Sequence, residues 1–327
     1  MKNNITGKIK KKSWLMLFMT FVLGVTLMGS YEKPVRVSAS TPTPNEAFKY
    51  SEIPWEKGCI EIEDVDTKKY GVNIVVPNQI DGMIVRIVDL KNKGLTSLDV
   101  SRCVSLQSLY CDDNNLTTLD VRQNYELFLL FCQNNNLTTL DVSKNTEITN
   151  LHCSYNKLLT LDVSKNAKLY NFSCVSNQLT TLDVSKNTAL TYFCCIKNQL
   201  TTLDVSKNIT LKKLECASNK LESLDLSKNA SLEFLDCYNN KLTKLDISNN
   251  ISLKNLYCQN NYISDLSYLN TWLQTHLGTI LPQNTGNLPG ASTSTITTQP
   301  PESTQEKPSD TTKTPSVTTL PSDTDSP

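Results

Sequence analysis

The sequence repeats with a period of 21 residues through its central part, and this period constrains the fold more than any other feature. Leucine and cysteine each recur at this spacing without a gap. Repetition of this length indicates a solenoid, in which every repeat forms one coil that packs only against its neighbours. The leucines are Leu98, Leu119, Leu140, Leu161, Leu182, Leu203, Leu224, Leu245 and Leu266, and the cysteines are Cys111, Cys132, Cys153, Cys174, Cys195, Cys216, Cys237 and Cys258.

One coil reads L-x-x-L-x-C-x-x-N-x-L-x-x-L-D-V-S-K-N-x-x. Around the cysteine, inward and outward positions alternate with a period of two, which predicts a short parallel strand. The Leu-Asp-Val segment alternates in the same way and predicts a second short extended segment on the opposite side of the coil. Two extended sides would both repeat at about 4.8 Å. We therefore expect a β-rich solenoid of low curvature, with a parallel sheet on the side that carries the cysteines.

Each half of the coil ends in an asparagine. We expect these side-chain amides to bond main-chain groups of the neighbouring coil, because a buried turn otherwise leaves polar backbone atoms without partners. The first row is Asn114, Asn135, Asn156, Asn177, Asn198, Asn219, Asn240 and Asn261, and the second is Asn124, Asn145, Asn166, Asn187, Asn208, Asn229 and Asn250.

The cysteine position faces the narrow interior of the coil, where a small apolar side chain fits without an unsatisfied polar group. In-register neighbours keep their Cβ atoms about 4.8 Å apart, which is longer than the ~3.5–4.5 Å of a disulfide. We therefore predict a structural ladder of buried free thiols. Scattered disulfides, or a role in soft-metal or redox chemistry, are the alternatives.

Three cysteines lie outside this ladder. Cys194 precedes an inward cysteine, so the alternation predicts an outward, exposed and reactive thiol. Cys103 takes the place of an asparagine in the second row, and Cys59 lies in the segment before the repeats. A bond between Cys59 and Cys103 would tie that segment to the first coil.

Residues 1–39 have the pattern of a secretory signal peptide. Several lysines precede an apolar run over 14–28, and Val37-Ser38-Ala39 offers small residues for cleavage. An uncleaved membrane anchor is the alternative, because the run is barely long enough to span a bilayer. We expect an exported chain with no membrane span after cleavage.

Four further segments follow the signal peptide. We expect an N-terminal cap with β structure over 40–94, in which Asp81-Gly82 forms a hairpin turn, and a solenoid over 95–262. Apolar residues at helical spacing, with Gly278 after them, predict a capping helix over 263–280. Residues 281–327 are rich in Ser, Thr and Pro and predict a disordered tail.

Function is expected on the cysteine-bearing side, because its outward residues vary from coil to coil while the Leu-Asp-Val side hardly changes. Apolar and aromatic side chains that point into water from a strand more often mark a contact surface than chance variation. The candidate binding face comprises Tyr110, Leu129, Phe131, His152, Tyr155, Val175, Tyr192, Ile196, Phe234, Tyr238 and Tyr257.

Other chemistries find little support. An aspartate recurs in every Leu-Asp-Val segment, with lysines three residues on, which favours a solvated face over a calcium site; the repeats lack the glycine-rich turns of calcium-binding β-rolls. Glu215 and Asp236 are neighbours on an open face, where nothing would separate their pKa values. We expect no enzyme, no cofactor and no metal. Thirty-two basic residues balance 32 acidic ones, which argues against nucleic acid.

The repeat LTTLDVSKNTALTYFCCIKNQ resembles the cysteine-ladder leucine-rich repeats of internalin J-type surface proteins of Gram-positive bacteria, over residues 95–262. The stretch VNIVVPNQIDGMIVRIVDL before it resembles the opening segment of BspA-type bacterial repeat proteins. Proteins of these families are secreted or wall-bound and bind components of host or neighbouring cells. The sequence LPQNTG has one residue more than the sorting signal L-P-x-T-G, so we expect no covalent attachment to the wall.

The resemblance implies an exported binding module that recognises a protein or glycan, as in adhesion at the bacterial cell surface. The alternative is a passive spacer or adaptor protein of the cell envelope. We expect a secreted or surface-associated monomer. Alanine at Tyr192, Phe234 and Tyr257 would separate the two functions.

Overall fold

The computed structural model describes residues 41–265, and from Pro42 onward they belong to one unit. The predicted signal peptide, the predicted tail and residues 266–280 of the predicted capping helix lie outside the described residues. Among the described residues, no helix is long and apolar enough to cross a membrane.

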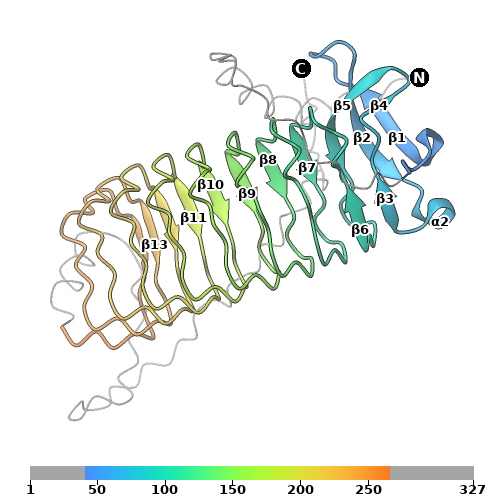
Figure 1. Cartoon of the computed structure of the whole chain (residues 1–327). Helices are drawn as coiled ribbons and strands as arrows, with labels where there is room; N and C mark the ends of the chain where they lie inside the picture. The colour runs from blue at the N-terminus through green and yellow to red at the C-terminus, as the bar shows by residue number, and fades with distance from the viewer. Residues whose placement is uncertain (1–40, 266–327) are drawn as a thin grey trace, which may run out of the picture. The chain divides into compact units, whose positions relative to one another are not determined.

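The N-terminal part is a small β structure whose strands lead directly into the repeats (Figure 1). β1 pairs antiparallel with β2, and β2 pairs parallel with β5. β4 and β5 form the predicted hairpin, with Asp81 and Gly82 both at positive φ in its two-residue turn. The elements are η1 (Asn45–Ala47), β1 (Phe48–Glu52), β2 (Cys59–Val65), α2 (Thr67–Tyr70), β3 (Asn73–Val75), β4 (Gln79–Ile80), β5 (Met83–Asp89) and β6 (Ser97–Asp99).

Eight three-residue strands, one from each coil, continue this sheet in parallel (Figure 1). Each residue pairs with the residue 21 positions later, as Leu151 with Phe172 and Phe172 with Phe193. The predicted solenoid of 21-residue coils with one parallel sheet is therefore confirmed. The strands are β7 (Ser108–Tyr110), β8 (Leu129–Phe131), β9 (Asn150–His152), β10 (Asn171–Ser173), β11 (Tyr192–Cys194), β12 (Lys213–Glu215), β13 (Phe234–Asp236) and β14 (Asn255–Tyr257).

The opposite side of the coil alternates in burial as predicted: Leu182 and Val184 are buried, and Asp183 between them is exposed. These segments do not pair into a second continuous sheet. Within residues 41–265 only β3 and β6 pair on this side. Beyond them the chain turns sharply after each valine, where the N–H of Asn187 donates to the Val184 carbonyl at 3.0 Å.

All eight ladder cysteines are fully buried, and the structure contains no disulfide between any of the cysteines, all of which lie within the described residues. Burial raises the pKa of Cys153 to about 12. Cys59 and Cys103 are separate free thiols, and Cys103 Sγ donates instead to the carbonyl of Pro77 at 3.3 Å. The bond between these two cysteines, considered from sequence, is not formed.

The asparagines bond to neighbouring coils as predicted, but the two rows differ. In the first row, Asn156 Nδ2 donates to the carbonyls of Cys132 at 3.0 Å and Cys153 at 3.1 Å, and its Oδ1 accepts from the N–H of Leu137 at 2.9 Å. In the second row, Asn166 Nδ2 donates to two carbonyls of the preceding coils. Its Oδ1 is buried and has no hydrogen-bond partner. The first row therefore satisfies more of its polar groups.

Arg86 on β5 links the N-terminal part to the first coils. Its Nε forms an ion pair with Glu56 at 2.9 Å, and its Nη1 lies 2.5 Å from Glu126 Oε2. Nη1 also donates to the Ser105 carbonyl at 3.0 Å. The Arg86 side chain is only 18% exposed, so these contacts hold a partly buried charge between cap and solenoid.

Candidate binding face

The first and third residues of each strand form two rows on the side away from the central, inward residue, although some of them, such as Ser108 and Asn150, are buried. In-register pairing places equivalent residues of successive coils side by side. We call the first residues of the strands the leading row and the third residues the trailing row. The leading row is Ser108, Leu129, Asn150, Asn171, Tyr192, Lys213, Phe234 and Asn255, and the trailing row is Tyr110, Phe131, His152, Ser173, Cys194, Glu215, Asp236 and Tyr257.

Three rings of the trailing row form an aromatic stack. The centroids of Tyr110 and Phe131 lie 5.1 Å apart, and those of Phe131 and His152 lie 4.5 Å apart at an interplanar angle of 16°. Parallel in-register strands impose this arrangement, since they repeat at about the thickness needed for stacked rings. Burial lowers the pKa of His152 to about 4, so this ring is neutral near pH 7. The stack offers an apolar ridge of ring edges.

A second group, the lysine-ring cluster, lies farther along the same face. Lys213 Nζ lies 5.2 Å from the ring centroid of Tyr192 and 4.6 Å from that of Phe234. The same ammonium forms an ion pair with Glu215 at 3.2 Å, and the Tyr192 hydroxyl donates to Glu215 Oε2 at 2.7 Å. The rings of Tyr192 and Phe234 and the Glu215 carboxylate thus surround the ammonium of Lys213, a cation that belongs to the chain itself.

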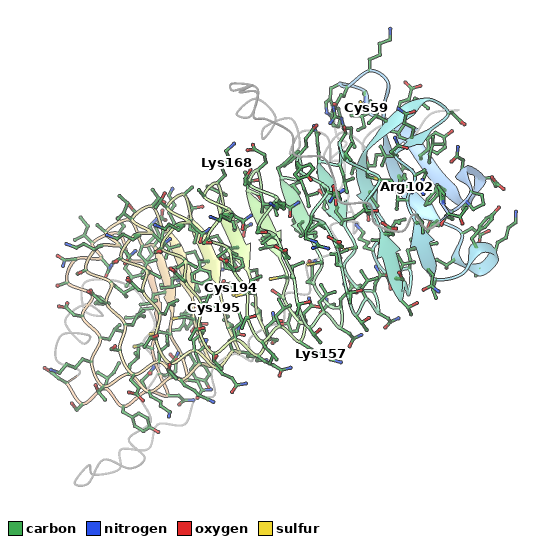
Figure 2. The ribbon with its side chains drawn as sticks, in the orientation of Figure 1. Cys59, Arg102, Lys157, Lys168, Cys194 and Cys195 are labelled. Carbon is green, nitrogen blue, oxygen red and sulfur yellow. The ribbon has the colours of Figure 1, made fainter. Side chains whose placement is uncertain are left out.

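The lysine-ring cluster changes the environment of Cys194, which lies on β11 beside the ladder residue Cys195 (Figure 2). Sequence alternation predicted an exposed thiol, but Cys194 is only 3% exposed. Tyr192 reaches past Cys194 to bond Glu215 on the next strand. Burial, and next the charge of Glu215, raise the pKa of the Cys194 thiol. The prediction of a reactive exposed thiol is therefore wrong.

Asp236 follows Glu215 in the trailing row and is flanked by aromatic residues. Phe234 precedes it by two residues, and Tyr257 is its in-register partner on β14. Asp236 Oδ1 accepts from the N–H of Tyr238 at 3.0 Å. Burial first, and then the nearby charge of Glu215, raise the pKa of Asp236 to about 6. The sequence predicted no pocket that would separate the pKa values of Glu215 and Asp236, yet burial on this open face is enough to raise the pKa of Asp236.

A family model described as Leucine Rich repeat matches residues 133–151. Among solved structures, the leucine-rich effector protein YopM from Yersinia pestis is similar, with 24% identity and a TM-score of 0.50; the match covers 61% of this chain and 54% of that one. The chain has the leucine-rich repeat fold.

Two further solved structures are similar to this leucine-rich repeat chain. The functional domain of InlJ from Listeria monocytogenes, which includes a cysteine ladder, has 32% identity and a TM-score of 0.47, covering 64% of this chain and 49% of that one. A leucine-rich repeat protein from Leptospira interrogans has 22% identity and a TM-score of 0.47, covering 54% of each chain. The leucine-rich repeat chain thus spans about half the length of these relatives. No curated protein sequence matches it.

The remaining predicted residues of the binding face differ in exposure. Leu129 is only 8% exposed, so it contributes little to an open surface, contrary to its expected outward role. Tyr155 is 37% exposed and has a φ of 55°, in the turn after its strand. The half-buried members of the predicted face are Tyr110, Phe131, His152, Val175, Tyr192, Ile196, Phe234, Tyr238 and Tyr257.

Three charged residues belong to this face although the sequence-based list did not include them. Lys213, Glu215 and Asp236 occupy the same rows as the predicted aromatic residues; Lys213 lies over the Phe234 ring, and Glu215 accepts from the Tyr192 hydroxyl. Their positions in the 21-residue period could have identified these three charged residues as members of the two rows. The sequence indicates Glu215 and Asp236 as neighbours on an open face, but the predicted binding face names only aromatic, apolar and histidine side chains.

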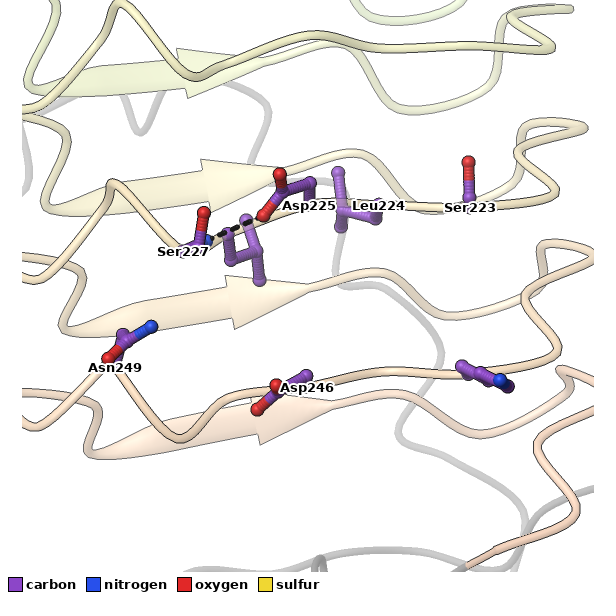
Figure 3. Close-up of a pocket in the computed structure, with 8 residues that line it drawn as sticks. Ser223, Leu224, Asp225, Ser227, Asp246 and Asn249 are labelled. Carbon is purple, nitrogen blue, oxygen red and sulfur yellow. Dashed lines mark hydrogen bonds between the residues drawn. The ribbon is translucent and has the colours of Figure 1, made fainter.

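The opposite side of the leucine-rich repeat uses its aspartates in local turns. Asp225 Oδ1 accepts from the N–H of Ser227 at 2.9 Å, and this bond is the dashed line in Figure 3. Equivalent bonds lower the pKa of each aspartate from Asp141 to Asp246. A shallow hollow beside Asp225 is lined by Asp246 and Asn249 of the next coil (Figure 3). Within residues 41–265, no group of three or more His, Cys, Asp or Glu side chains is placed to hold a metal ion.

Proposed function

We propose that the chain is an exported recognition module that binds a protein partner through its strand face at the bacterial cell surface. The observation that carries this proposal is the contrast between the two outward sides. The aromatic stack and the lysine-ring cluster occupy one side. The other side repeats Leu-Asp-Val-Ser-Lys-Asn almost unchanged. Exposed apolar groups with a few charged side chains are typical of protein contact surfaces.

The geometry of the rings favours a protein over a glycan. Sugars bind aromatic side chains mainly through the flat face of the ring. In the aromatic stack, Phe131 has Tyr110 on one face and His152 on the other. The exposed edges suit side chains and backbone of a polypeptide better. Adhesion is the specific role we propose, because the candidate signal peptide would export the chain and the strand face would then meet other cells.

Surface plasmon resonance against a panel of purified extracellular proteins tests this function, with the whole chain immobilised. The variant Tyr192→Ala/Phe234→Ala/Tyr257→Ala removes three rings of the strand face, and Thr160→Ala/Thr181→Ala/Thr202→Ala changes three exposed residues of the opposite side. We expect the ring variant to lose at least about tenfold in affinity for any partner found, because buried aromatic anchors dominate interfaces. The threonine variant should bind like the unmodified chain.

Circular dichroism of both variants must show an intact fold. A correctly folded ring variant that binds its partner with unchanged affinity would overturn the recognition face and favour the passive spacer. The monomeric state and the likeness of the cap to BspA-type proteins stay predictions.

A further inference from the structure

Asp236 is a partly buried carboxylate that forms no ion pair within the described residues. The ion pairs of this region involve other side chains: Lys213 pairs with Glu215, and Lys212 and Lys254 pair with Glu233. Glu215 is neutralised by Lys213 and also accepts the Tyr192 hydroxyl. The charge of Lys213 also acts on Asp236, so one ammonium serves two carboxylates, and the lysine-ring cluster together with Asp236 carries one negative charge in excess.

Aromatic residues occupy three positions around this carboxylate. Phe234 lies two residues before it on the same strand, about 7 Å away, and Tyr257 is its partner about 4.8 Å away on the next strand. Tyr238 lies two residues after it, beyond the end of β13, where its N–H donates to Asp236 Oδ1. The rings of Phe234 and Tyr257 are in contact, with centroids 5.5 Å apart. The Tyr238 hydroxyl accepts from Asn260 Nδ2 at 2.7 Å, which fixes its position. The carboxylate thus lies in an apolar frame with one polar anchor.

The neighbouring coil shows what such a frame holds. There, Lys213 brings its ammonium between the rings of Tyr192 and Phe234 and pairs with Glu215. Its methylene stem reaches along the rings while its head meets the carboxylate. On the strand of Asp236, the leading-row position that Lys213 occupies beside Glu215 is taken by Phe234, which carries no charge. Among the described residues no lysine or arginine forms an ion pair with Asp236, so a cation from a partner could take the equivalent place.

We propose that Asp236, Phe234, Tyr238 and Tyr257 form a receptor for one arginine or lysine side chain of a partner polypeptide. The proposal rests on the proposed function, since it assigns a chemical class to the partner of the strand face. Arginine suits the receptor best, because its planar guanidinium pairs with a carboxylate through two hydrogen bonds and also stacks on aromatic rings. Neutralising a partly desolvated carboxylate is the source of affinity.

Peptide display on the whole chain tests the receptor. A library of random linear peptides is selected on the unmodified chain, and bound peptides are then measured against Asp236→Asn. Asparagine keeps the acceptor for the Tyr238 N–H and removes only the charge. Asp225→Asn, on the opposite side, is the matched control for loss of one carboxylate. A synthetic peptide with citrulline in place of the selected arginine removes the charge from the ligand.

We expect enriched peptides to share one basic residue. Asp236→Asn and the citrulline peptide should each lose at least about tenfold in affinity, and the two changes together should lose little more than either alone. Asp225→Asn should stay within about twofold. Phe234→Leu, which keeps an apolar side chain without a ring, should lose about three- to fivefold.

The absence of any enriched peptide, enrichment without a basic residue, or equal losses for Asp236→Asn and Asp225→Asn would each overturn the receptor. The partner found by surface plasmon resonance distinguishes a failure of the receptor from a failure of the proposed function on which it rests. If the triple ring variant loses that partner while Asp236→Asn retains it, the receptor is wrong and the recognition face stands. If the ring variant also retains the partner, the recognition face itself is wrong.

Discussion

At the scale of single residues, Tyr192 shows how one side chain can change the chemistry of another. Its hydroxyl donates to Glu215 on the adjacent strand, and Cys194, which the tyrosine side chain passes, is buried. A thiol that alternation places in water is thereby shielded from reagents and kept protonated. The tyrosine ring also flanks Lys213, so it contributes both to shielding and to the charge arrangement of the face.

Removing this cover should expose one thiol. In Tyr192→Ala we expect Cys194 to react with a thiol reagent in the folded state, because the side chain that reaches past it to Glu215 and interacts with its thiol is lost. Counting modified cysteines by mass spectrometry measures the effect. Tyr170→Ala, a change at a tyrosine that is 45% exposed, is the control and should add no reactive thiol. Adding Cys194→Ser to Tyr192→Ala should abolish the new reaction, and persistence of the reaction would contradict the assignment.

Asp236 should make stability depend on pH. Its pKa is about 6 in the folded chain, against 3.8 for the free group, so folding favours its protonated form. The contribution of this carboxyl to stability is complete below about pH 4 and is lost as pH rises through 6. The charged groups that face it, Lys213 and Glu215, lie on β12.

Asp236→Asn should therefore raise the free energy of unfolding at pH 7 by about 1–3 kcal/mol and leave it unchanged at pH 4. Urea unfolding at a series of pH values measures the difference. Parallel pH profiles for the two proteins would show that the carboxyl is not desolvated.

At the scale of elements, the two asparagine rows stabilise the coil unequally. Asn156 satisfies three carbonyls and one N–H of the backbone, including a longer bond to the Ser154 carbonyl at 3.3 Å. Asn166 satisfies two carbonyls and leaves its own Oδ1 without a partner. The strand-side turn thus depends more heavily on its asparagine than the opposite turn does.

Alanine substitutions should reveal this inequality. Asn156→Ala leaves more buried backbone groups unpaired and should cost about 3–5 kcal/mol, while Asn166→Ala should cost about 2–3 kcal/mol. Urea unfolding followed by circular dichroism compares the two. A larger loss for Asn166→Ala would contradict the inference that the strand-side turn depends more heavily on its asparagine than the opposite turn does.

At the scale of the whole described unit, Arg86 joins the N-terminal β structure to the solenoid. Its partners Glu56, Ser105 and Glu126 come from both parts. Solenoids need such a junction because an uncovered first coil would expose its apolar interior.

Arg86→Met keeps the apolar stem of the side chain and removes its charge, which leaves two carboxylates and a carbonyl without their partner. We expect a loss of about 1–3 kcal/mol in the free energy of unfolding and faster proteolysis within residues 42–94. Arg122→Met is the control, since the ion pair of Arg122 with Asp120 is about half exposed and should contribute less than about 1 kcal/mol. Equal effects of the two substitutions would argue against the junction.

Features set by the repeat or by local turn chemistry could be predicted from the sequence. Phe172 faces inward because its place in the 21-residue period does, and Asp81-Gly82 forms a tight turn because both residues accept positive φ. The environments of Leu129 and Cys194 could not be predicted in this way, since they depend on which neighbouring side chain lies across them. The receptor at Asp236 likewise depends on contacts between coils, which periodicity does not specify.

Because the strands pair in register, the length of the solenoid can change by one whole coil at a time. Every coil passes the same hydrogen-bonding pattern to the next, so a whole coil can be gained or lost without disturbing the pairing on either side. Each such event between β9 and β13 would move the aromatic stack relative to Asp236 by one step of about 4.8 Å. Evolution, or a designer, can therefore tune the span between two anchoring points on a partner in discrete increments, while the chemistry of each point is retained.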